Sequence, residues 1–426
     1  MKINLVAQHP TFLHFFYSCI MGEVVIIGGG PAGATTALRL AQLGVRSTVI
    51  DKATFPRDKI CGDALSGKTV EVIRKLNALW LDEIRSKEVF LGSYGVTFVA
   101  PSGEALRVPF KKDFTPGDAA PGFISRRIDF DDWLIEKVRM EPLITLVEGV
   151  ACRHFERLPN GYRIQAGDNW IDASLVIAAD GAQSAFAKQE GGLQKEAAHN
   201  CFGLRAYFEG VSGLDEQHFI ELHFLKEFLP GYFWIFPLPG GRANVGVGMR
   251  ADVISSKKIA LKKSFETLIT THPQLRQRFS KARLEGTVKQ FGLPLGSKKR
   301  QLSGANFLLC GDAAMLIDPF TGEGIGNAMM SGLIAAEVAA SACKNANYDA
   351  TFLSAYDQRV YQRLGSELQL SYRMQQLVRF PWLFNLVVRK ANSNPVLKET
   401  ISCMFEDIDL RERLKDPRFY FRLIFG

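Results

Sequence analysis

The stretch Glu23–Lys52, EVVIIGGGPAGATTALRLAQLGVRSTVIDK, constrains the fold more than any other part of the sequence. It begins with four β-branched residues, a run that is typical of a strand buried on both faces of a parallel sheet. The pattern Gly28-x-Gly30-x-x-Gly33 follows directly, then a helical pattern, and then a second apolar strand that ends at Asp51. This order predicts a β-α-β unit of the dinucleotide-binding type.

Each residue of the pattern has a physical role in such a unit. Gly28 permits the tight turn, Gly30 lets a pyrophosphate approach the backbone, and Gly33 lets the helix pack closely on the strand. The helix N-terminus offers free N–H groups and a positive dipole to the phosphates. Asp51 lies 21 residues after Gly30, where an acid accepts the ribose hydroxyls. The unit predicts a dinucleotide ligand but does not distinguish NAD from FAD.

Two later segments favour FAD. LVIAADGAQSAFAK (Leu175–Lys188) is another apolar strand, which ends at Asp180-Gly181. In Asn306–Ala340 a strand ends at Gly311-Asp312, where the carboxylate can accept hydrogen bonds from a polyol. The same segment has a second glycine-rich loop that opens a long helix of small residues, and the N-terminus of that helix can stabilise negative charge on a reduced isoalloxazine ring.

These three fingerprints, in this order, resemble the FAD-dependent oxidoreductases that are built like para-hydroxybenzoate hydroxylase. Within that superfamily the chain is similar to the geranylgeranyl reductase family over roughly residues 22–345. The motifs of that family are found in FPRDKICGDALSG (Phe55–Gly67), SRRIDFDDWL (Ser125–Leu134), DPFTGEGI (Asp318–Ile325) and the aromatic and glycine pattern of Tyr232–Gly248. Hydroxylases more often carry a Gly-Gln-Gly variant of the third motif.

The motifs and the resemblance together imply a set of site residues. The implied cofactor-binding residues are Gly28, Gly30, Ala32, Gly33, Asp51, Lys52, Arg57, Cys61, Gly62, Asp63, Ala64, Arg127, Ala151, Asp180, Gly181, Asp312, Gly322, Gly324 and Ile325. The implied substrate-binding residues are Tyr232, Trp234, Phe236, Pro237, Gly246 and Gly248. No histidine spacing indicates a metal site, and we predict none.

The stretch PGYFWIFPLPGGRANVGVG predicts a hairpin whose residues alternate between two faces. Tyr232, Trp234 and Phe236 then share one face, and Gly246 and Gly248 leave space beside them on the returning strand. The hairpin is either plain sheet core or the wall of a cavity for a flat apolar ligand. Both interpretations can hold at once.

Cys61, and the pair Arg57 and Lys59, each leave two interpretations open. Cys61, followed by Gly62 and close to a predicted helix start, can have a lowered thiol pKa and a covalent or proton-transfer role in catalysis. It can equally be a small residue in a cavity wall. Arg57 and Lys59 either pair with phosphates or an anionic substrate, or are plain surface charges.

We expect an α/β fold in which a Rossmann-type FAD-binding domain receives an inserted substrate domain with an antiparallel sheet. The FAD-binding domain spans 22–185 and 300–345, with its main segments at roughly 22–75, 120–185 and 300–345. The insert is 186–299, and a helical region follows at 346–426.

Composition and charge exclude several classes of protein. The chain of 426 residues has a net charge of +8 but no dense basic stripe and no nucleic-acid-binding module, so we expect no nucleic-acid partner. The seven cysteines are scattered and contain no CxxC pair, which argues against a disulfide framework and for a reducing, cytoplasmic location.

Both ends of the chain need separate interpretations. Residues 1–21 read as an upstream extension outside the fold, with Met21 as a plausible start; a weak signal peptide or anchor is the alternative. Near the C-terminus, RFPWLFNLVVRK and DPRFYFRLIFG have apolar centres with basic residues beside them. They are either helices that pack on the catalytic body or a peripheral membrane contact.

The resemblance implies a reductase that transfers hydride from reduced FAD to carbon–carbon double bonds of a polyprenyl lipid. NAD(P)H or a reduced electron-carrier protein would supply the electrons, and Tyr232 or a held water could supply the proton. A flavin monooxygenase or halogenase with an aromatic or other apolar substrate is the alternative enzyme. A lipid carrier that keeps FAD as a structural group is the non-enzymatic one.

Overall fold

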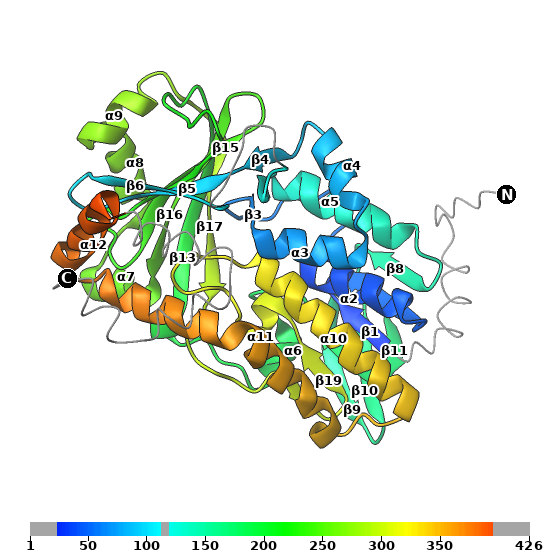
Figure 1. The fold of residues 1–426 in the computed structure, drawn as a ribbon. Coiled ribbons are helices and arrows are strands. Elements are labelled where there is room, and N and C mark those ends of the chain that lie inside the picture. The colour runs from blue at the N-terminus through cyan, green and yellow to red at the C-terminus, as the bar shows by residue number, and fades with distance from the viewer. Residues whose placement is uncertain (1–23, 112–118, 395–426) are drawn as a thin grey trace.

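The computed structural model describes residues 24–111 and 119–394, and two large β-sheets organise this part of the chain (Figure 1). The predicted N-terminal extension and the DPRFYFRLIFG segment lie outside the described residues. One sheet belongs to a Rossmann-type FAD-binding domain, and the other forms the main part of a second domain, as the α/β prediction required.

The first sheet has six strands in the order β18-β19-β12-β1-β2-β8, and all of them run parallel except β18. Its central strands are buried on both faces, because helices cover one face and a small sheet packs near the other. Its strands are β1 (Val24–Ile27), β2 (Ser47–Asp51), β8 (Ile144–Glu148), β12 (Leu175–Ala178), β18 (Ser303–Gly304) and β19 (Phe307–Leu309).

Two helices of small residues pack closely beside this sheet. Helix α2 (Pro31–Gln42) lies on β1 and β2 and packs along α10 (Ile325–Asn345). A Cβ on Gly332 of α10 would lie 2.4 Å from the carbonyl oxygen of Ala32, so only glycine allows the two helices to approach this closely. Helix α10 is long and apolar enough to cross a membrane, but 78% of its apolar window is buried inside the protein, as in a core helix.

The remaining elements of this half complete the domain. The three-stranded sheets have the orders β11-β10-β9 and β3-β7-β4. The helices are α3 (Gly67–Leu76), α4 (Trp80–Ser86), α5 (Arg127–Arg139) and α6 (Ala185–Gln189), with the 3-10 turn η2 (Gly311–Ala314). The strands are β3 (Ala64–Leu65), β4 (Leu91–Ser93), β7 (Gly122–Ile124), β9 (Cys152–Leu158), β10 (Gly161–Ala166) and β11 (Asn169–Ala173).

The second sheet has seven strands in the order β17-β13-β16-β15-β14-β5-β6, antiparallel except for β14 and β5. Its outer face is covered by α7 (Ala251–Lys257), α8 (Leu261–Thr271) and α9 (Pro273–Phe279), next to the 3-10 turn η1 (Ala197–His199). The strands are β5 (Gly95–Val99), β6 (Ala105–Pro109), β13 (Asn200–Glu209), β14 (Ile220–His223), β15 (Tyr232–Leu238), β16 (Arg242–Arg250) and β17 (Arg283–Pro294).

This sheet differs from the predicted domain boundaries in one respect. Strands β5 and β6 come from the range 22–185, yet β5 pairs with β14 and β6 pairs with β5, so the two form one edge of the second sheet. The insert 186–299 therefore does not form the second sheet alone. The pairing is long-range, and the alternating pattern of two short strands carries no information about which edge they join.

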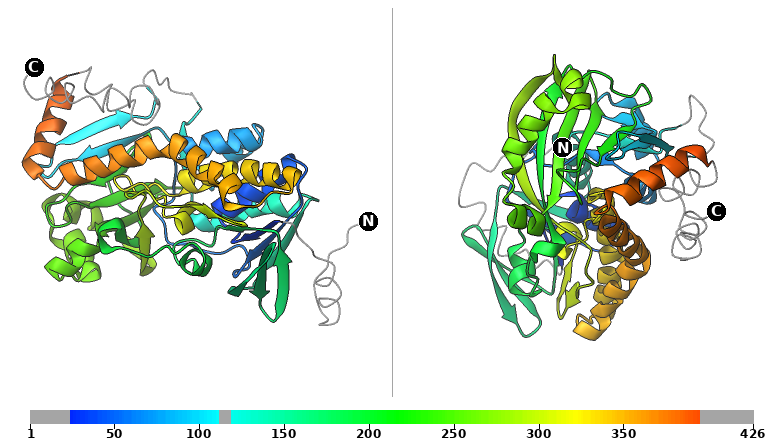
Figure 2. Two further views of the ribbon diagram at one scale, coloured as in Figure 1. Left: turned by 90° about the horizontal axis from the view of Figure 1, so that it is seen from below. Right: turned by 90° about the vertical axis from the view of Figure 1, so that its left-hand side faces the viewer.

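Two C-terminal helices connect the halves of the molecule. Helix α11 (Ala350–Leu377) runs along the protein from the FAD-binding domain to the second sheet, and α12 (Pro381–Ser393) lies beside β6 (Figure 2). Leu353, Val360 and Leu364 of α11 are fully buried in the core of the first domain. The expected helical region after residue 346 is therefore present up to Ser393 and packs on the catalytic body.

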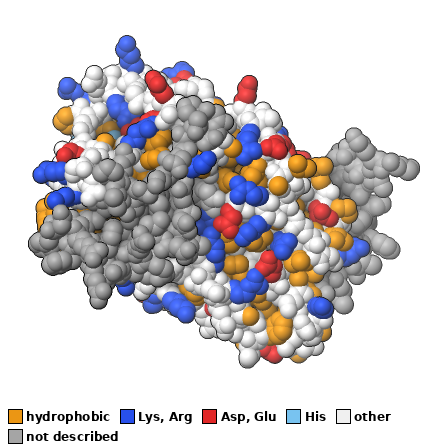
Figure 3. All heavy atoms as spheres, in the orientation of Figure 1, with side chains coloured by type: hydrophobic (Ala, Val, Ile, Leu, Met, Phe, Trp, Pro, Cys, Tyr) orange, Lys and Arg blue, Asp and Glu red, His pale blue; other side chains and the backbone are white. Residues whose placement is uncertain are grey.

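Charged side chains on the face drawn in Figure 3 are mixed in sign. Over α3, α10 and α11 they form ion pairs such as Arg39–Glu337 and Arg363–Glu71.

Candidate functional site

One cavity of about 1600 Å³ lies between the two sheets. It begins at the carboxyl edge of the six-stranded sheet, passes the inner face of the seven-stranded sheet and reaches α11 and α12. Cavities that hold one drug-sized ligand are roughly 300–1,000 Å³, so this one has room for two ligands. We describe it as a cofactor end, at the first sheet, and an apolar end, near α12.

The cofactor end begins where β1 meets α2. Gly28 has a φ of +101°, and a Cβ there would lie 2.5 Å from the carbonyl oxygen of Ala179. Gly30 is the N-cap of α2, no side chain caps this helix, and Pro31 occupies its first turn. The N-terminal N–H groups of α2 are therefore available to a phosphate at the cavity wall.

Gly33 and Asp51 support this turn. A Cβ on Gly33 would lie 1.8 Å from the carbonyl oxygen of Gly28, so Gly33 serves helix packing and does not line the cavity. The Asp51 carboxylate accepts the N–H of Gly29 at 2.7 Å and that of Ala53 at 2.8 Å. Asp51 lines the cavity, with lone pairs left for the hydroxyls of a ribose.

Buried ion pairs hold the residues that were predicted to reach the cofactor. Arg127 forms a bidentate pair with Asp131, with both contacts at 2.6 Å, and Arg57 bonds the same carboxylate at 2.7 Å. The pKa of Asp131 is lowered, because the two guanidinium groups outweigh the effect of burial. Lys59 Nζ lies 3.1 Å from Asp312 Oδ2, so a lysine and the predicted polyol acceptor meet across the cavity wall.

The Gly-Glu-Gly loop sits at the start of α10. Asp318 Oδ1 accepts the backbone N–H groups of Phe320 and Thr321 at 2.9 and 2.8 Å, which fixes the turn. Gly322 has a φ of +75°. Gly324 is the N-cap of α10, and no side chain caps that helix either. Its free N–H groups suit an anionic ring or phosphate.

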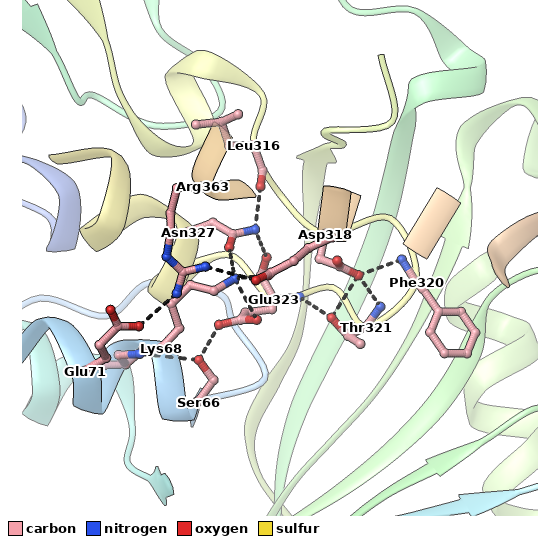
Figure 4. A network of polar contacts seen from close by, with 12 residues as sticks. Ser66, Lys68, Glu71, Leu316, Asp318, Phe320, Thr321, Glu323, Asn327 and Arg363 are labelled. Atoms are coloured by element: carbon pink, nitrogen blue, oxygen red, sulfur yellow. Dashed lines mark hydrogen bonds and ion pairs between the residues drawn. The ribbon is translucent and has the colours of Figure 1, made fainter. Parts of the chain in front are cut away.

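A network of charges connects this loop to two other helices (Figure 4). Lys68 of α3 bonds Asn327 at 2.6 Å and Glu367 of α11 at 2.7 Å, and lies 3.7 Å from Glu323. Arg363 of α11 also pairs with Glu367, at 3.0 Å. Ser66 Oγ donates to Glu323. The loop is therefore held by α3 and α11 together.

The structure brings most of the predicted site residues together. The predicted cofactor residues that line the cavity are Gly28, Gly30, Ala32, Asp51, Lys52, Arg57, Cys61, Gly62, Asp63, Ala64, Arg127, Asp180, Gly181, Asp312, Gly322, Gly324 and Ile325. The predicted substrate residues that line it are Tyr232, Trp234, Phe236 and Gly248. Gly33, Ala151, Pro237 and Gly246 do not line it.

The aromatic hairpin forms a wall of the cavity. Tyr232, Trp234 and Phe236 face the cavity, while Phe233 and Ile235 pack in the core on the other face of the sheet. Tyr232 Oη donates to the carbonyl oxygen of Thr321 and so ties the hairpin to the Gly-Glu-Gly loop. Burial raises the pKa of Tyr232, which keeps this hydroxyl protonated.

The prediction for Gly246 was wrong in its physical reason. A Cβ on Gly246 would lie 2.2 Å from an indole carbon of Trp234, so the space beside the strand is filled by that side chain. At Gly248 the nearest atom to such a Cβ is 3.9 Å away. Of these two glycines, Gly248 is the one that leaves open space in the cavity.

The expectation of a reactive Cys61 was also wrong. Helix α3 begins only at Gly67, with Ser66 as its N-cap, so Cys61 is not at a helix N-terminus. Burial raises the pKa of the Cys61 thiol instead of lowering it. The structure therefore supports the other interpretation, a small residue in the cavity wall.

A buried carboxyl group beside Cys61 forms a second polar cluster. The sequence named Asp63 for the cofactor, but its partners Tyr207 and Asn244 were missed. Asp63 Oδ2 accepts Tyr207 Oη at 2.7 Å and Asn244 Nδ2 at 2.8 Å. Asn244 Oδ1 in turn accepts Trp234 Nε1 at 2.9 Å. Asn244 is two and four residues before Gly246 and Gly248, so it lies on the same face of β16. This alternation was the one signal in the sequence that could have pointed to Asn244.

The apolar end of the cavity was missed almost entirely. Phe320 stacks on Phe224 with ring centroids 5.5 Å apart, and Phe224 contacts Phe384 of α12 at 4.7 Å. Val378 and Val388 also line this end. No motif marks these side chains, because ordinary core positions hold the same residue types.

Comparison with known proteins supports the assignment of the cofactor end. Residues 21–100 match a family model described as an FAD binding domain. The chain is 31% identical to a digeranylgeranylglycerophospholipid reductase of Methanopyrus kandleri over 350 residues, 79% of this chain and 85% of that protein. It is also 31% identical to a menaquinone reductase of Mycobacterium tuberculosis over 327 residues, 74% of this chain and 76% of that one.

Solved structures share the fold. A geranylgeranyl bacteriochlorophyll reductase-like protein of Thermoplasma acidophilum has a TM-score of 0.74 and 22% identity, covering 94% of this chain and 98% of its own. A flavin-dependent brominase reaches a TM-score of 0.73 at 19% identity, covering 94% of this chain and 99% of its own. The glycine turns, the two uncapped helix N-termini and the polyol acceptors of the cofactor end fit FAD. The protein belongs to the geranylgeranyl reductase family of FAD-dependent oxidoreductases.

Proposed function

We propose that this protein uses FAD to reduce carbon–carbon double bonds of a polyprenyl lipid. One observation carries the proposal: a single cavity of about 1600 Å³ joins the cofactor end to a long apolar end. A prenyl chain is apolar over its whole length and needs such an enclosed path to reach a flavin ring. The names of the curated relatives, which include a digeranylgeranylglycerophospholipid reductase, support the same substrate class.

Reduced flavin, when bound, supplies a hydride. The residues of the chain supply the position and the environment. Trp234 and Phe236 offer flat apolar surfaces along one side of the path, and Phe320 and Phe384 close it from the other elements. These walls exclude water from the reacting bond.

The head group and the electron donor are separate parts of the proposal. The relatives are named for a phospholipid and for a quinone, and either head group can remain outside the apolar end while its prenyl tail enters. For the donor we propose NAD(P)H or a reduced electron-carrier protein. Anaerobic mixing of the oxidised protein with each donor, followed by flavin absorbance, distinguishes them.

The test of the function is also anaerobic. The flavin is reduced chemically, oxygen is excluded, a geranylgeranyl lipid is added, and the return of oxidised-flavin absorbance is followed. We expect reoxidation together with a mass gain of two hydrogens for each reduced bond. Reoxidation only after air is admitted would contradict the proposal and favour oxygen-dependent chemistry, as in the brominase that shares this fold.

We further propose that the turn between α11 and α12 touches a membrane surface, with the protein otherwise cytoplasmic. Phe380 and Trp382 of this turn are 56% and 66% exposed. The adjacent Leu383 and Phe384 line the cavity. Arg379 lies in the turn, and Arg389 and Lys390 lie near the end of α12; basic side chains there can interact with anionic lipid. A lipid could then pass from the bilayer to the apolar end.

Vesicle co-sedimentation tests this contact. Replacing Phe380 and Trp382 together by serine should weaken binding to vesicles that contain anionic phospholipid, because it removes the exposed apolar surface. The matched control is Leu79→Ser, which removes an apolar side chain that is 73% exposed on α4's N-cap. Equal binding by the double variant and the control would exclude this turn as the contact.

A further inference from the structure

Reduction of an isolated double bond needs a proton as well as a hydride, and none of the motifs identifies its source. We propose that the Asp63 carboxyl group donates this proton to the substrate carbon and is recharged through Tyr207. This inference rests on the proposed function, and it adds a catalytic residue to it.

The position of Asp63 is unusual for a carboxylate. The residue is fully buried, has a φ of 69° and lies in the cavity wall between Gly62 and Ala64. A non-glycine residue in this left-handed conformation is uncommon and is typical of functional sites. An aspartate occupies this position, although a glycine would adopt the left-handed backbone conformation with less strain.

The two oxygens of this carboxyl group have different surroundings. Oδ2 accepts hydrogen bonds from Tyr207 and Asn244, as described above. Oδ1 is buried and has no hydrogen-bond partner among the described residues. Burying an ionised carboxylate with an unpaired oxygen costs more free energy than burying the neutral acid, because the charged form loses more solvation. The geometry therefore suits a proton on Oδ1.

Several other acidic groups of the wall have partners or places of their own. Tyr232 donates a hydrogen bond to the carbonyl oxygen of Thr321, and the Asp318 carboxylate fixes the loop turn. Asp180 Oδ1 also has no hydrogen-bond partner among the described residues, but Asp180 follows β12 at the cofactor end, among the residues predicted to hold FAD. Glu323 is bonded by Ser66 and lies near Lys68. Burial raises the pKa of the Cys61 thiol, and thiols with raised pKa values are weak acids.

The charge environment of Asp63 supports the proposal. Burial raises its pKa from 3.8 to about 6, against the hydrogen bonds of Tyr207 and Asn244 and the positive charges of Arg205 and Arg127. A carboxyl group that titrates near neutral pH is both partly protonated and a strong enough acid to donate. These groups come from three elements that face Asp63, namely β13, β16 and the start of α5.

Tyr207 provides a route for resupply. Its hydroxyl bonds Asp63, and its side chain is only half-buried. The Arg205 guanidinium lies 4.1 Å from the centre of the Tyr207 ring and pairs with Asp58 at 2.8 Å. Asp58 also pairs with Lys289, whose side chain is 44% exposed, so the cluster leads from the cavity to solvent.

The proposed reduction conserves electrons and protons. A hydride from reduced flavin adds to one alkene carbon, so the flavin loses two electrons and the alkene gains them. The O–H bond of Asp63 breaks, and its proton forms a C–H bond at the other carbon. The resulting Asp63 carboxylate takes a proton from Tyr207 Oη while that oxygen takes one from water in the same concerted transfer, because burial raises the pKa of the Tyr207 phenol and no free tyrosinate forms.

The experiment compares Asp63→Asn with the wild type in the FAD-bound protein. We expect anaerobic reoxidation by a geranylgeranyl lipid to slow by about 10²–10⁴-fold, the usual contribution of a general acid. Ferricyanide takes electrons without a proton from the protein, so the rate of reoxidation by ferricyanide in Asp63→Asn should stay within about twofold of the wild-type rate. FAD content is measured in both proteins and the rates are compared per bound FAD, because Asp63 is also one of the predicted cofactor residues. Asp63→Glu should recover part of the rate, and Glu209→Gln, which breaks an exposed ion pair on the same strand as Tyr207, is the control.

A second measurement does not depend on the substrate. Infrared difference spectra of the oxidised protein should contain a carboxyl group that titrates near pH 6, disappears in Asp63→Asn and moves to higher pH in Tyr207→Phe, since that variant loses a hydrogen bond to the carboxylate. A wild-type rate in Asp63→Asn, or no such titration, would overturn the inference. A wild type that titrates as expected but reduces no prenyl lipid would refute the proposed function and, with it, this prenyl step.

Discussion

The two ends of the cavity are built in opposite ways. At the cofactor end, short contiguous stretches place their residues at the carboxyl ends of β1, β2, β12 and β19, where parallel strands meet at one edge. At the apolar end, Phe98 of β5, Trp234 of β15 and Phe384 of α12 come from three distant parts of the chain. The cofactor end depends on backbone conformation and the apolar end on side-chain volume.

This difference predicts different responses to substitution. A change at the cofactor end meets backbone atoms that cannot move without unfolding the β-α-β unit. A change at the apolar end meets side chains that can repack, so the fold should survive while substrate fit changes. Substitutions at each end can test this contrast.

The largest effect is expected from Gly33→Ala. The new Cβ would lie 1.8 Å from the Gly28 carbonyl oxygen, so α2 must move away from β1. We expect loss of bound FAD and a destabilisation of about 3 kcal/mol or more, measured as FAD content and denaturant midpoint. The control is Gly44→Asn, because Gly44 has a φ of +77°, which asparagine tolerates, and no neighbour near its Cβ. If Gly33→Ala kept its FAD, backbone contact would not explain the cofactor end.

A similarly large effect is expected where the two ends are joined. Lys68→Met removes the cation that the half-buried Glu323 and Glu367 share, and Glu367 then keeps only Arg363. Removing one partner of a fully buried ion pair costs about 3–5 kcal/mol, so we expect a loss of about 3 kcal/mol here. The Gly-Glu-Gly loop should loosen, with a changed flavin absorbance spectrum. Lys75→Met removes an exposed pair on the same helix and should cost under about 0.5 kcal/mol. Equal losses in the two variants would mean that the network of Figure 4 does not support the loop.

Phe384→Ala tests the apolar end. It removes a buried ring that contacts Phe224 at a centroid distance of 4.7 Å. We expect a stability loss of about 3 kcal/mol and a higher KM for the prenyl lipid, with FAD content unchanged. Phe384→Leu should recover most of the stability. Loss of FAD in Phe384→Ala would break the separation between the two ends.

The smallest effect concerns pH. The pKa of Asp63 in the folded protein, about 6, is above its ordinary value of 3.8. The folded state therefore binds this proton more tightly than the unfolded state, and stability from this group is lost as the pH rises from about 4 to about 6. Asp63→Asn lacks that loss, so its stability relative to wild type should rise by up to about 3 kcal/mol between those pH values. Denaturant titrations at several pH values measure the difference, and parallel curves would contradict it.

Much of the cofactor end could be predicted from sequence. Asp51, Asp180 and Asp312 were each placed from the strand that precedes them, and all three line the cavity. The failures have physical causes. The room assigned to Gly246 is taken by Trp234, and Cys61 lies too far before α3 for the helix to lower its pKa. Neither fact can be read from spacing, because each depends on how a side chain or a loop packs.

The sequence by itself determined the β-α-β unit, the FAD fingerprints and the aromatic face of the hairpin. These features depend on local backbone geometry, in which glycine positions and strand alternation fix the result within a few residues. The tertiary structure alone decided that β5 and β6 complete the second sheet, that α11 and α12 line the apolar end, and that Asp63 meets Tyr207 and Asn244. Those contacts join residues far apart in the chain, and they depend on packing and burial, which no local pattern encodes.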